Sequence, residues 1–258
     1  MGLFGNFFEK KTCDVCGAEI SLLGNRKLED GNLCKKCAAK LSPWFSERRH
    51  STLAEIKAQL AYREANRGAV AAFHCTRTLG ENMRVLLDED AGTFLVTGAR
   101  DLAEENPDVL QFEQVTGCDV DIDETRTEQT YRDKQGNEVG YKPPRYLFRY
   151  DFTVVVHVNH PYFDEMRFRL NNSPVEVDSG PGNSLLGGSG AGERSMAFRQ
   201  YRAMAEQIKS VLTEARQTVR ETKAAAQAPK AACTCPWCGA TTTPDANGCC
   251  AYCGGALH

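Results

Sequence analysis

Two sets of four cysteines, one near each end of the 258-residue chain, constrain its fold more than any other feature. Each set holds two CxxC motifs, separated by seventeen residues in the first set and by eleven in the second. Paired CxxC turns let four sulfurs surround one ion, which is the arrangement that Zn²⁺ prefers. We therefore predict two structural Zn²⁺ sites. Their ligands are Cys13, Cys16, Cys34 and Cys37 in the first, and Cys235, Cys238, Cys250 and Cys253 in the second.

Other roles for these motifs have less support. Disulfide bonds belong mainly to oxidising compartments, and a redox CxxC needs no second pair. Iron is an alternative ion for a four-cysteine site. A closed site of this kind leaves no position open for a substrate, which indicates a structural role. In the second set, Cys233 and Cys249 compete as ligands. We prefer Cys250 because it keeps the CxxC-Gly pattern of its partner motif. Each such CxxC-Gly turn is called a knuckle.

The composition favours a protein of a reducing cytoplasm. No stretch approaches the roughly 20 apolar residues of a membrane span. The first ten residues have neither the basic start nor the apolar core of a secretory signal. The net charge of −3 is unlike that of a strongly basic nucleic-acid binder.

The pattern along the chain predicts an α+β fold with a small metal-binding unit at each end. Residues 1–50 form an N-terminal four-cysteine zinc finger, 51–68 a connecting helix, 69–222 a central antiparallel β domain with a long C-terminal helix, 223–232 a linker, and 233–258 a C-terminal zinc ribbon. The ribbon is too short to fold on apolar burial alone. Metal binding supplies about 10–16 kcal/mol in comparable small units.

Local signals place the elements of the centre. Thr52 and Glu55 fit a capping box that begins a helix, and Gly68 suits its C-terminal end. Strands are expected at 82–87, 93–97, 109–115, 118–122, 146–158 and 163–170. The glycine-rich segment 171–194 is expected to be a loop. A long helix should begin at Ser195, with an apolar stripe of Met204, Ile208, Val211, Ala215 and Val219.

Three segments resemble known families. The stretch CDVCGAEISLLGNRKLEDGNLCKKCAAKLSPWF resembles a family of bacterial N-terminal zinc-finger domains of uncharacterised function, with all four cysteines, the NRKLEDG turn and the Leu-Ser-Pro matched. The stretch CPWCGATTTPDANGCCAYCGG resembles a generic zinc ribbon. By pattern alone, the centre resembles a bacterial pleckstrin-homology-like domain, with strands followed by one long helix. These resemblances imply zinc-stabilised folds and bring no activity with them.

Other groups that could carry chemistry have structural explanations. Asp119, Asp121 and Asp123 lack the glycine and the glutamate of a calcium loop, so we expect a strand with one acidic face. His157 is expected within a strand and His160 in a turn. No phosphate loop or known catalytic motif occurs. We expect the isolated thiols of Cys75 and Cys118 to be buried and inert.

The function expected is that of a zinc-binding, non-catalytic interaction or scaffolding protein with a protein partner. The ribbon would contact that partner through exposed residues such as Trp237 and Tyr252, although packing on the zinc unit is as plausible for both. The alternative is a nucleic-acid-binding protein that acts through the N-terminal finger and the helix after it. Residues 11–50 hold eight basic and five acidic side chains, so the finger carries 8 − 5 = +3 before the two negative charges of a zinc site.

Overall fold

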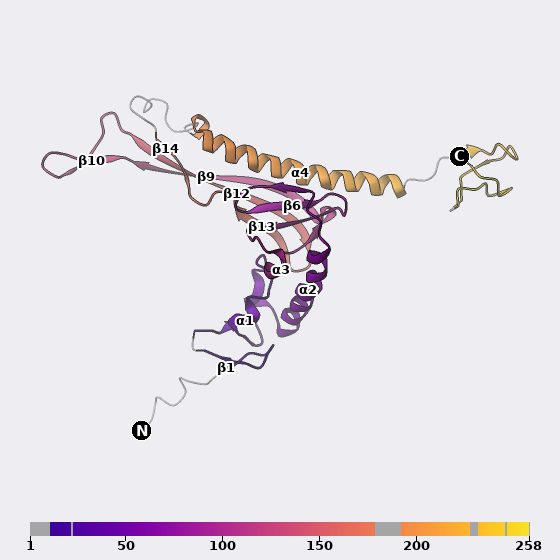
Figure 1. Ribbon diagram of the computed structural model, residues 1–258, viewed down its shortest axis with the longest axis horizontal. Coiled ribbons are helices and arrows are strands. Elements are labelled where there is room, and N and C mark those ends of the chain that lie inside the picture. The colour runs from indigo at the N-terminus through magenta and orange to yellow at the C-terminus, as the bar shows by residue number, and fades with distance from the viewer. Residues whose placement is uncertain (1–10, 22, 179–191, 228–231, 246, 258) are drawn as a thin grey trace, which may run out of the picture. The chain divides into compact units, whose positions relative to one another are not determined.

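A computed structural model describes residues 11–21, 23–178, 192–227, 232–245 and 247–257 (Figure 1). The chain divides into two compact units, Met1–Arg216 and Gln217–His258. The fold is mixed α+β, with a four-cysteine group near each end and a long helix before the second group, as the sequence predicts. The glycine loop was expected at 171–194, of which residues 179–191 lie outside the described residues. The expectation was wrong at Val175–Asp178, which form a strand of the second sheet.

The N-terminal finger consists of short elements around a small apolar core. Its elements are β1 (Lys11–Thr12), β2 (Glu19–Ile20), β3 (Arg26–Lys27), β4 (Asn32–Leu33), α1 (Lys35–Ala38) and η1 (Glu47–His50). Strand β1 pairs with β2, and β3 pairs with β4, both antiparallel. The buried core joins Cys13, Cys34 and Cys37 to Leu28 and Leu33. The metal-binding residues therefore form part of the finger's core.

Helix α2 (Leu53–Ala72) follows the finger and begins where the sequence predicts. The Thr52 hydroxyl accepts from the backbone N–H of Glu55, and the Glu55 carboxylate accepts from that of Thr52. The helix does not end at Gly68 but continues to Ala72, where Phe73 turns into an extended conformation. The apolar segment after Gly68 therefore extends the helix.

The first sheet of the central domain has four antiparallel strands in the order β5-β6-β7-β8. The strands are β5 (Arg77–Leu79), β6 (Arg84–Asp88), β7 (Thr93–Thr97) and β8 (Leu110–Gln111). The strands predicted at 82–87 and 93–97 are present as β6 and β7, which form a hairpin with Leu87 paired to Phe94. Helix α3 (Leu102–Glu105) lies between β7 and β8 in the chain, and η2 (Phe112–Gln114) follows β8.

The second sheet is built on β12 (Tyr146–His160), the long strand that the sequence predicts most clearly. Strand β9 (Val115–Glu128) pairs along one edge of β12, whereas β13 (Phe163–Arg169) and β14 (Val175–Asp178) share the other edge. Strand β9 covers the predicted strand 118–122 and extends well beyond it. The single strand predicted at 109–115 was wrong, because that segment divides into β8, η2 and the first residue of β9. The hairpin of β10 (Thr130–Arg132) and β11 (Glu138–Gly140) connects β9 to β12.

Helix α4 (Met196–Gln227) follows the short turn η3 (Gly192–Arg194). Its first part lies along the sheet that holds β9 and β12 (Figure 1), and Phe198 stacks edge-on against Phe152 of β12. The deeply buried positions are Phe198, Ala205, Ile208 and Leu212. The predicted stripe shares only Ile208 with this set, because its other members are half-buried beside it.

The C-terminal ribbon has one small hairpin of β15 (Cys233–Thr234) and β16 (Thr241–Thr242). An isolated bridge between Cys249 and Ala256 supports the second half. No large apolar side chain of the ribbon is buried among residues 232–245 and 247–257; Cys235 and Cys250 are its buried apolar residues. Metal ligation by these cysteines would therefore supply the cohesion that apolar packing does not.

Candidate metal centres

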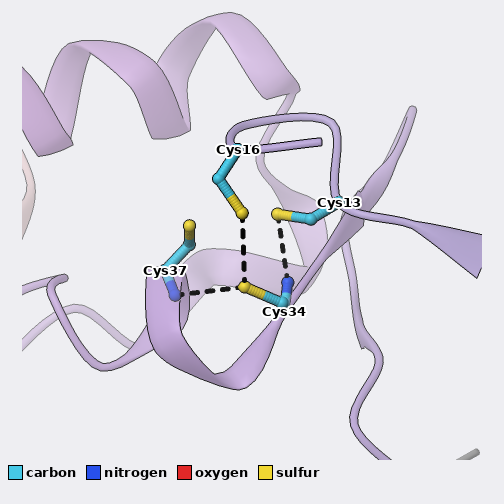
Figure 2. Close-up of side chains that lie close together, drawn as sticks. All are labelled: Cys13, Cys16, Cys34 and Cys37. Atoms are coloured by element: carbon cyan, nitrogen blue, oxygen red, sulfur yellow. Dashed lines mark hydrogen bonds between the residues drawn. The ribbon is translucent and has the colours of Figure 1, made fainter. Parts of the chain in front are cut away.

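The four cysteines of the first set converge from separate elements. Cys13 and Cys16 flank the turn after β1, Cys34 follows β4, and Cys37 lies in α1. Their sulfurs all lie within 4.8 Å of one another, and the Sγ atoms of Cys16 and Cys34 are 3.7 Å apart (Figure 2). Gly17 closes the turn with a positive φ of 71°, a conformation that glycine adopts without strain.

Backbone N–H groups point at these sulfurs. The N–H of Cys34 donates to Sγ of Cys13 at 3.3 Å, and that of Cys37 donates to Sγ of Cys34 at 3.4 Å (Figure 2). Burial opposes ionisation of Cys13, but the N–H groups of Cys16, Cys34 and Val15 outweigh it and lower the pKa of this thiol to about 6. The first centre therefore offers a sulfur that ionises readily, as metal ligation requires.

The second centre repeats this design in the ribbon. The sulfurs of Cys235, Cys238, Cys250 and Cys253 lie within 4.8 Å of one another. Across the two knuckles, Sγ of Cys235 is 3.6 Å from Sγ of Cys253, and Sγ of Cys238 is 3.7 Å from Sγ of Cys250. Backbone N–H groups of Cys253 and Tyr252 lower the pKa of the Cys250 thiol to about 7. Both knuckles end in a glycine of positive φ, at Gly239 and Gly254.

The two competing cysteines lie outside the second group. Cys233 contacts the carbonyl of Thr242 at 3.7 Å, and Cys249 contacts the carbonyl of Asn247 at 3.8 Å. The structure therefore brings Cys250, rather than Cys249, to the other three sulfurs.

The spacing of the sulfurs suits a tetrahedral ion. A tetrahedron with metal–sulfur bonds of about 2.3 Å has sulfur–sulfur edges of about 3.8 Å. The contacts that cross between knuckles, 3.6–3.7 Å, are close to this edge length in both groups. Four sulfurs and no other donor would fill the coordination shell, so each group could hold a metal such as zinc in a closed site.

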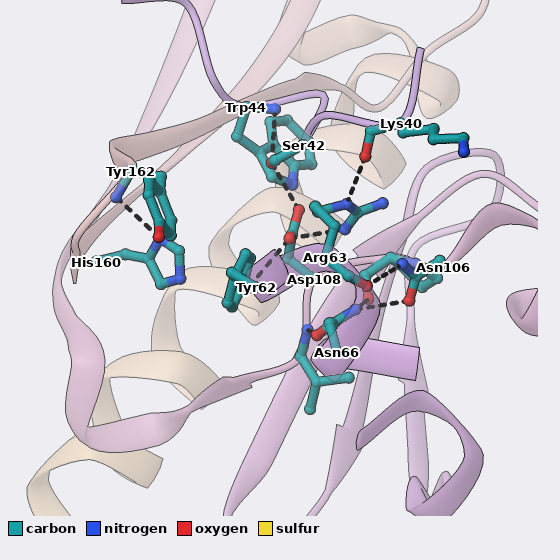
Figure 3. Close-up of polar contacts among 12 residues, drawn as sticks. Lys40, Ser42, Trp44, Tyr62, Arg63, Asn66, Asn106, Asp108, His160 and Tyr162 are labelled. Carbon is teal, nitrogen blue, oxygen red and sulfur yellow. Dashed lines mark hydrogen bonds and ion pairs between the residues drawn. The ribbon is translucent and has the colours of Figure 1, made fainter. Parts of the chain in front are cut away.

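A buried polar cluster joins the finger to the central domain, and the sequence analysis did not identify it. It consists of Ser42, Tyr62, Arg63, Asn66, Asn106 and Asp108 (Figure 3). The fully buried carboxylate of Asp108 accepts from Ser42 Oγ at 2.7 Å, Arg63 Nη1 at 2.8 Å and Tyr62 Oη at 3.1 Å. Arg63 also donates from Nε to the carbonyl of Lys40 at 3.2 Å. We call this set the joint cluster.

Aromatic rings surround one side of the joint cluster. The ring of Tyr62 lies 4.9 Å from that of His160 and 5.3 Å from that of Tyr162, between centroids (Figure 3). Burial, aided by the charge of Asp108, raises the pKa of Tyr62. Burial lowers the pKa of His160, against a smaller opposing effect of Asp108. His160 is thus a neutral packing residue near pH 7. It is the last residue of β12, so its expected place in the turn was wrong.

The acidic strand has the structural role that was expected. Asp119 and Asp121 lie on the outer face of β9, where they meet basic groups of neighbouring elements. The carboxylate of Asp119 lies 3.1 Å from His157 Nε2 and 3.8 Å from Lys209 Nζ, and that of Asp121 lies 3.0 Å from Arg167 Nη1. These exposed contacts pair both acids with neighbouring side chains.

The two isolated thiols differ. Cys118 is buried in β9, and burial raises its pKa to about 11, which agrees with an inert thiol. Cys75 is exposed in the segment between α2 and β5, so the expectation that it is buried was wrong. The misplacement follows from α2, whose four extra residues place Cys75 in a connection instead of a strand.

Comparison with known proteins gives a match to part of the chain. A family model described as "Domain of unknown function (DUF4428)" matches residues 12–59, which include the first four cysteines and the beginning of α2. No curated protein and no solved structure matches the chain. The match supports a zinc-finger-like N-terminal unit, whereas a bacterial origin and a pleckstrin-homology-like centre stay predictions. Among the described residues, no helix is both long and apolar enough for a bilayer crossing.

Proposed function

We propose that this chain is a non-catalytic interaction protein of a bacterial cytoplasm, held in shape by two structural Zn²⁺ ions. Zinc is favoured because four thiolates at tetrahedral spacing are its preferred closed site. A reducing compartment keeps these thiols available for metal. With the coordination shell filled by sulfur, neither ion has a position for a substrate, so the ions serve the fold and the interaction surface lies on side chains around them.

The observation that carries the interaction role is a pair of exposed aromatic side chains on the ribbon. Trp237 and Tyr252 occupy the same position in the two knuckles, the residue before the second cysteine. Their exposed fractions are 74% and 75%. Large aromatic side chains held at a surface are the residues that most often dominate protein–protein binding energy.

The indole of Trp237 is held in place although it is exposed. Its Nε1 donates to the carbonyl of Ala256 at 3.3 Å, and a side chain at Gly255 would collide with the ring at 2.5 Å. A ring that is fixed before binding loses little conformational entropy when a partner covers it. The ring of Trp237 therefore packs directly against the backbone of Gly255.

The negative charge of the ribbon favours a partner whose protein surface is neutral or basic. Residues 233–258 contain no Lys or Arg, and a zinc ion with four thiolates carries two negative charges. A phosphate backbone would be repelled by this unit. Cationic side chains of a partner would gain from the negative site and from the faces of the two aromatic rings.

The test compares proteins captured from the native cell by the full-length chain and by two variants. We expect Trp237→Ser combined with Tyr252→Ser to abolish capture of specific partners with the zinc content unchanged at two ions per chain. The control is Tyr131→Ser, which removes an exposed tyrosine of β10, 44% accessible, outside the ribbon. Identical capture by the double variant and the parent protein would refute the ribbon as the interaction surface.

A further inference from the structure

Three arginines of the N-terminal finger lie together on one face. Strand β3 contributes Arg26, and η1, which packs against β3, contributes Arg48 and Arg49. Arg48 Nη1 donates to the carbonyl of Lys27 at 3.0 Å, which fixes η1 on the strand. Burial lowers the pKa of Arg48, and the positive charges of Arg26 and Arg49 lower it further. Below, the arginine face means Arg26, Lys27, Arg48 and Arg49.

No carboxylate compensates these guanidinium groups within the described part of the chain. None of the three arginines takes part in an ion pair among residues 11–21, 23–178, 192–227, 232–245 and 247–257. The neighbouring Glu47 accepts from the hydroxyl of Ser46 at 3.2 Å. The arginine face is therefore a group of like charges that an anion would stabilise.

Two acids of the finger, Asp14 and Asp30, are engaged away from the arginine face. Asp14 accepts from the backbone N–H of Asn32 at 2.6 Å, and Asp30 accepts from that of Leu53 at 2.7 Å. Both carboxylates thus serve as local caps of turns and of α2. These two carboxylates are therefore not available to neutralise the arginine face.

The metal site does not cancel this balance. A zinc ion with four thiolates would add two negative charges to the finger. Lys35 and Lys36 lie between the ligands Cys34 and Cys37 in the chain and are exposed. They offset the charge of the site where it arises, so the arginine face keeps its own positive potential.

We propose that the arginine face binds the phosphodiester backbone of a nucleic acid, without reading its sequence. Guanidinium groups match phosphate oxygens in a two-pronged geometry, and several on adjoining rigid elements can follow successive phosphates. A lipid surface is a less suitable occupant, because membrane attachment by basic residues is usually completed by apolar side chains that enter the bilayer. Among the described residues of the finger, Leu23 is the single large apolar side chain that is exposed.

The site extends beyond the proposed function, because it lies in the other compact unit and selects an anionic partner, whereas the ribbon is proposed to select a neutral or basic one. Three phosphate contacts on duplex DNA would give a logarithmic salt slope of about −2.7. Raising KCl from about 50 mM to about 200 mM would then weaken binding about 40-fold. This dependence distinguishes phosphate contacts from apolar association.

The experiment uses the full-length, zinc-loaded chain and fluorescence anisotropy. The probes are a labelled 20-base-pair DNA duplex and a labelled 20-nucleotide single strand, at the two salt concentrations. We expect the combined Arg26→Gln, Arg48→Gln and Arg49→Gln variant to lose binding at least 10-fold. The matched control removes the same charge from the β10–β11 region, with Arg132→Gln, Lys134→Gln and Lys142→Gln, and should bind as the parent does.

Single variants keep the test valid if the triple variant does not fold. Arg26→Gln and Arg49→Gln should each reduce the magnitude of the salt slope by about 0.9 if each arginine contacts one phosphate. Zinc content and circular dichroism report whether the finger is intact. The ribbon double variant at Trp237 and Tyr252 should bind nucleic acid unchanged, so this proposal and the proposed function fail independently.

Several results would overturn the inference. Absence of binding to both probes at low salt would do so, as would equal losses in the arginine variant and its matched control. The last measurement tests binding of the chain to vesicles that contain 30% phosphatidylserine. Binding to these vesicles that depends on the arginine face, together with no binding to nucleic acid, would assign the face to a membrane surface instead.

Discussion

Adjacent cysteines in the ribbon have different neighbours. Sγ of Cys250 lies 3.7 Å from Sγ of Cys238, whereas Sγ of Cys249 contacts the carbonyl of Asn247. The backbone explains the difference, because Cys249 pairs with Ala256 in a bridge while the N–H of Cys250 donates to the carbonyl of Gly255. The second bond starts the knuckle turn, and the turn directs the sulfur of Cys250 to the ion site.

Metal content provides a direct test at this scale. The parent chain should hold two zinc ions, and Cys250→Ser should hold one, because three thiolates bind zinc far more weakly than four. Cys249→Ser is the matched control and should retain both ions. Elemental analysis of the purified proteins measures the ratio. Loss of an ion on the Cys249 substitution, with Cys250→Ser unaffected, would show that the ligands are assigned to the wrong residue.

Residue spacing was enough to predict the grouping of these cysteines but not the exposure of every thiol. A CxxC-Gly pattern specifies a local turn, and its geometry depends on few residues outside the motif. The burial of Cys75 depends instead on where α2 ends, several residues earlier. Local chemistry is therefore readable from the sequence, whereas burial that depends on the length of a neighbouring element is not.

At the scale of elements, the helix starts were predictable and the helix ends were not. The capping box of Thr52 and Glu55 is a local, reciprocal pair of hydrogen bonds, so the sequence specifies the start of α2. Gly68 does not end the helix, because glycine ends helices through a positive φ and Gly68 is not among the glycines with one. A single exposed glycine destabilises an α-helix by only about 1 kcal/mol. The alanines around Gly68 favour the helix and Val70 is buried, so the helix continues past this position.

The packing face of α4 leads to a paired prediction. Leu212 is fully buried, while its neighbour Val211, a member of the stripe expected from periodicity, is half-buried. We expect Leu212→Ala to lower the free energy of unfolding of the central domain by about 2–5 kcal/mol. Val211→Ala should lower it by about 1 kcal/mol. Urea denaturation followed by circular dichroism measures both, and a larger loss for Val211→Ala would place the other stripe against the sheet.

At the scale of the whole molecule, the joint cluster links the first metal centre to the central domain. Lys40 and Ser42 follow the ligand Cys37 closely in the chain. The carbonyl of Lys40 accepts from Arg63, and the hydroxyl of Ser42 donates to Asp108. The members lie up to 66 residues apart in sequence, so no local pattern could have indicated that they meet. Because of this link, the folded structure of the finger and that of the central domain stabilise each other.

Loss of the first metal site should consequently loosen a region that contains no cysteine ligand. We expect Cys37→Ser to release the 40–42 segment, so that Arg63 and Asp108 lose the partners that complete their burial. The ion pair between Arg63 and Asp108 would remain, but each charge would lose a hydrogen bond to the 40–42 segment. Hydrogen bonds to charged groups contribute about 1.5–3 kcal/mol each. Hydrogen exchange of the peptide that spans residues 106–112 should become faster.

The control for this effect is the second metal site, which belongs to the other compact unit. Cys238→Ser should remove its zinc and speed exchange in the ribbon while the peptide at 106–112 exchanges as in the parent chain. Asp108→Asn tests the route itself, because it removes the charge that Arg63 needs but leaves both metal sites intact. If Cys37→Ser left exchange at 106–112 unchanged while Asp108→Asn accelerated it, the joint cluster would stabilise the central domain without depending on the metal. If instead both substitutions accelerate exchange there and Cys238→Ser does not, the finger's ion stabilises the β domain through Asp108.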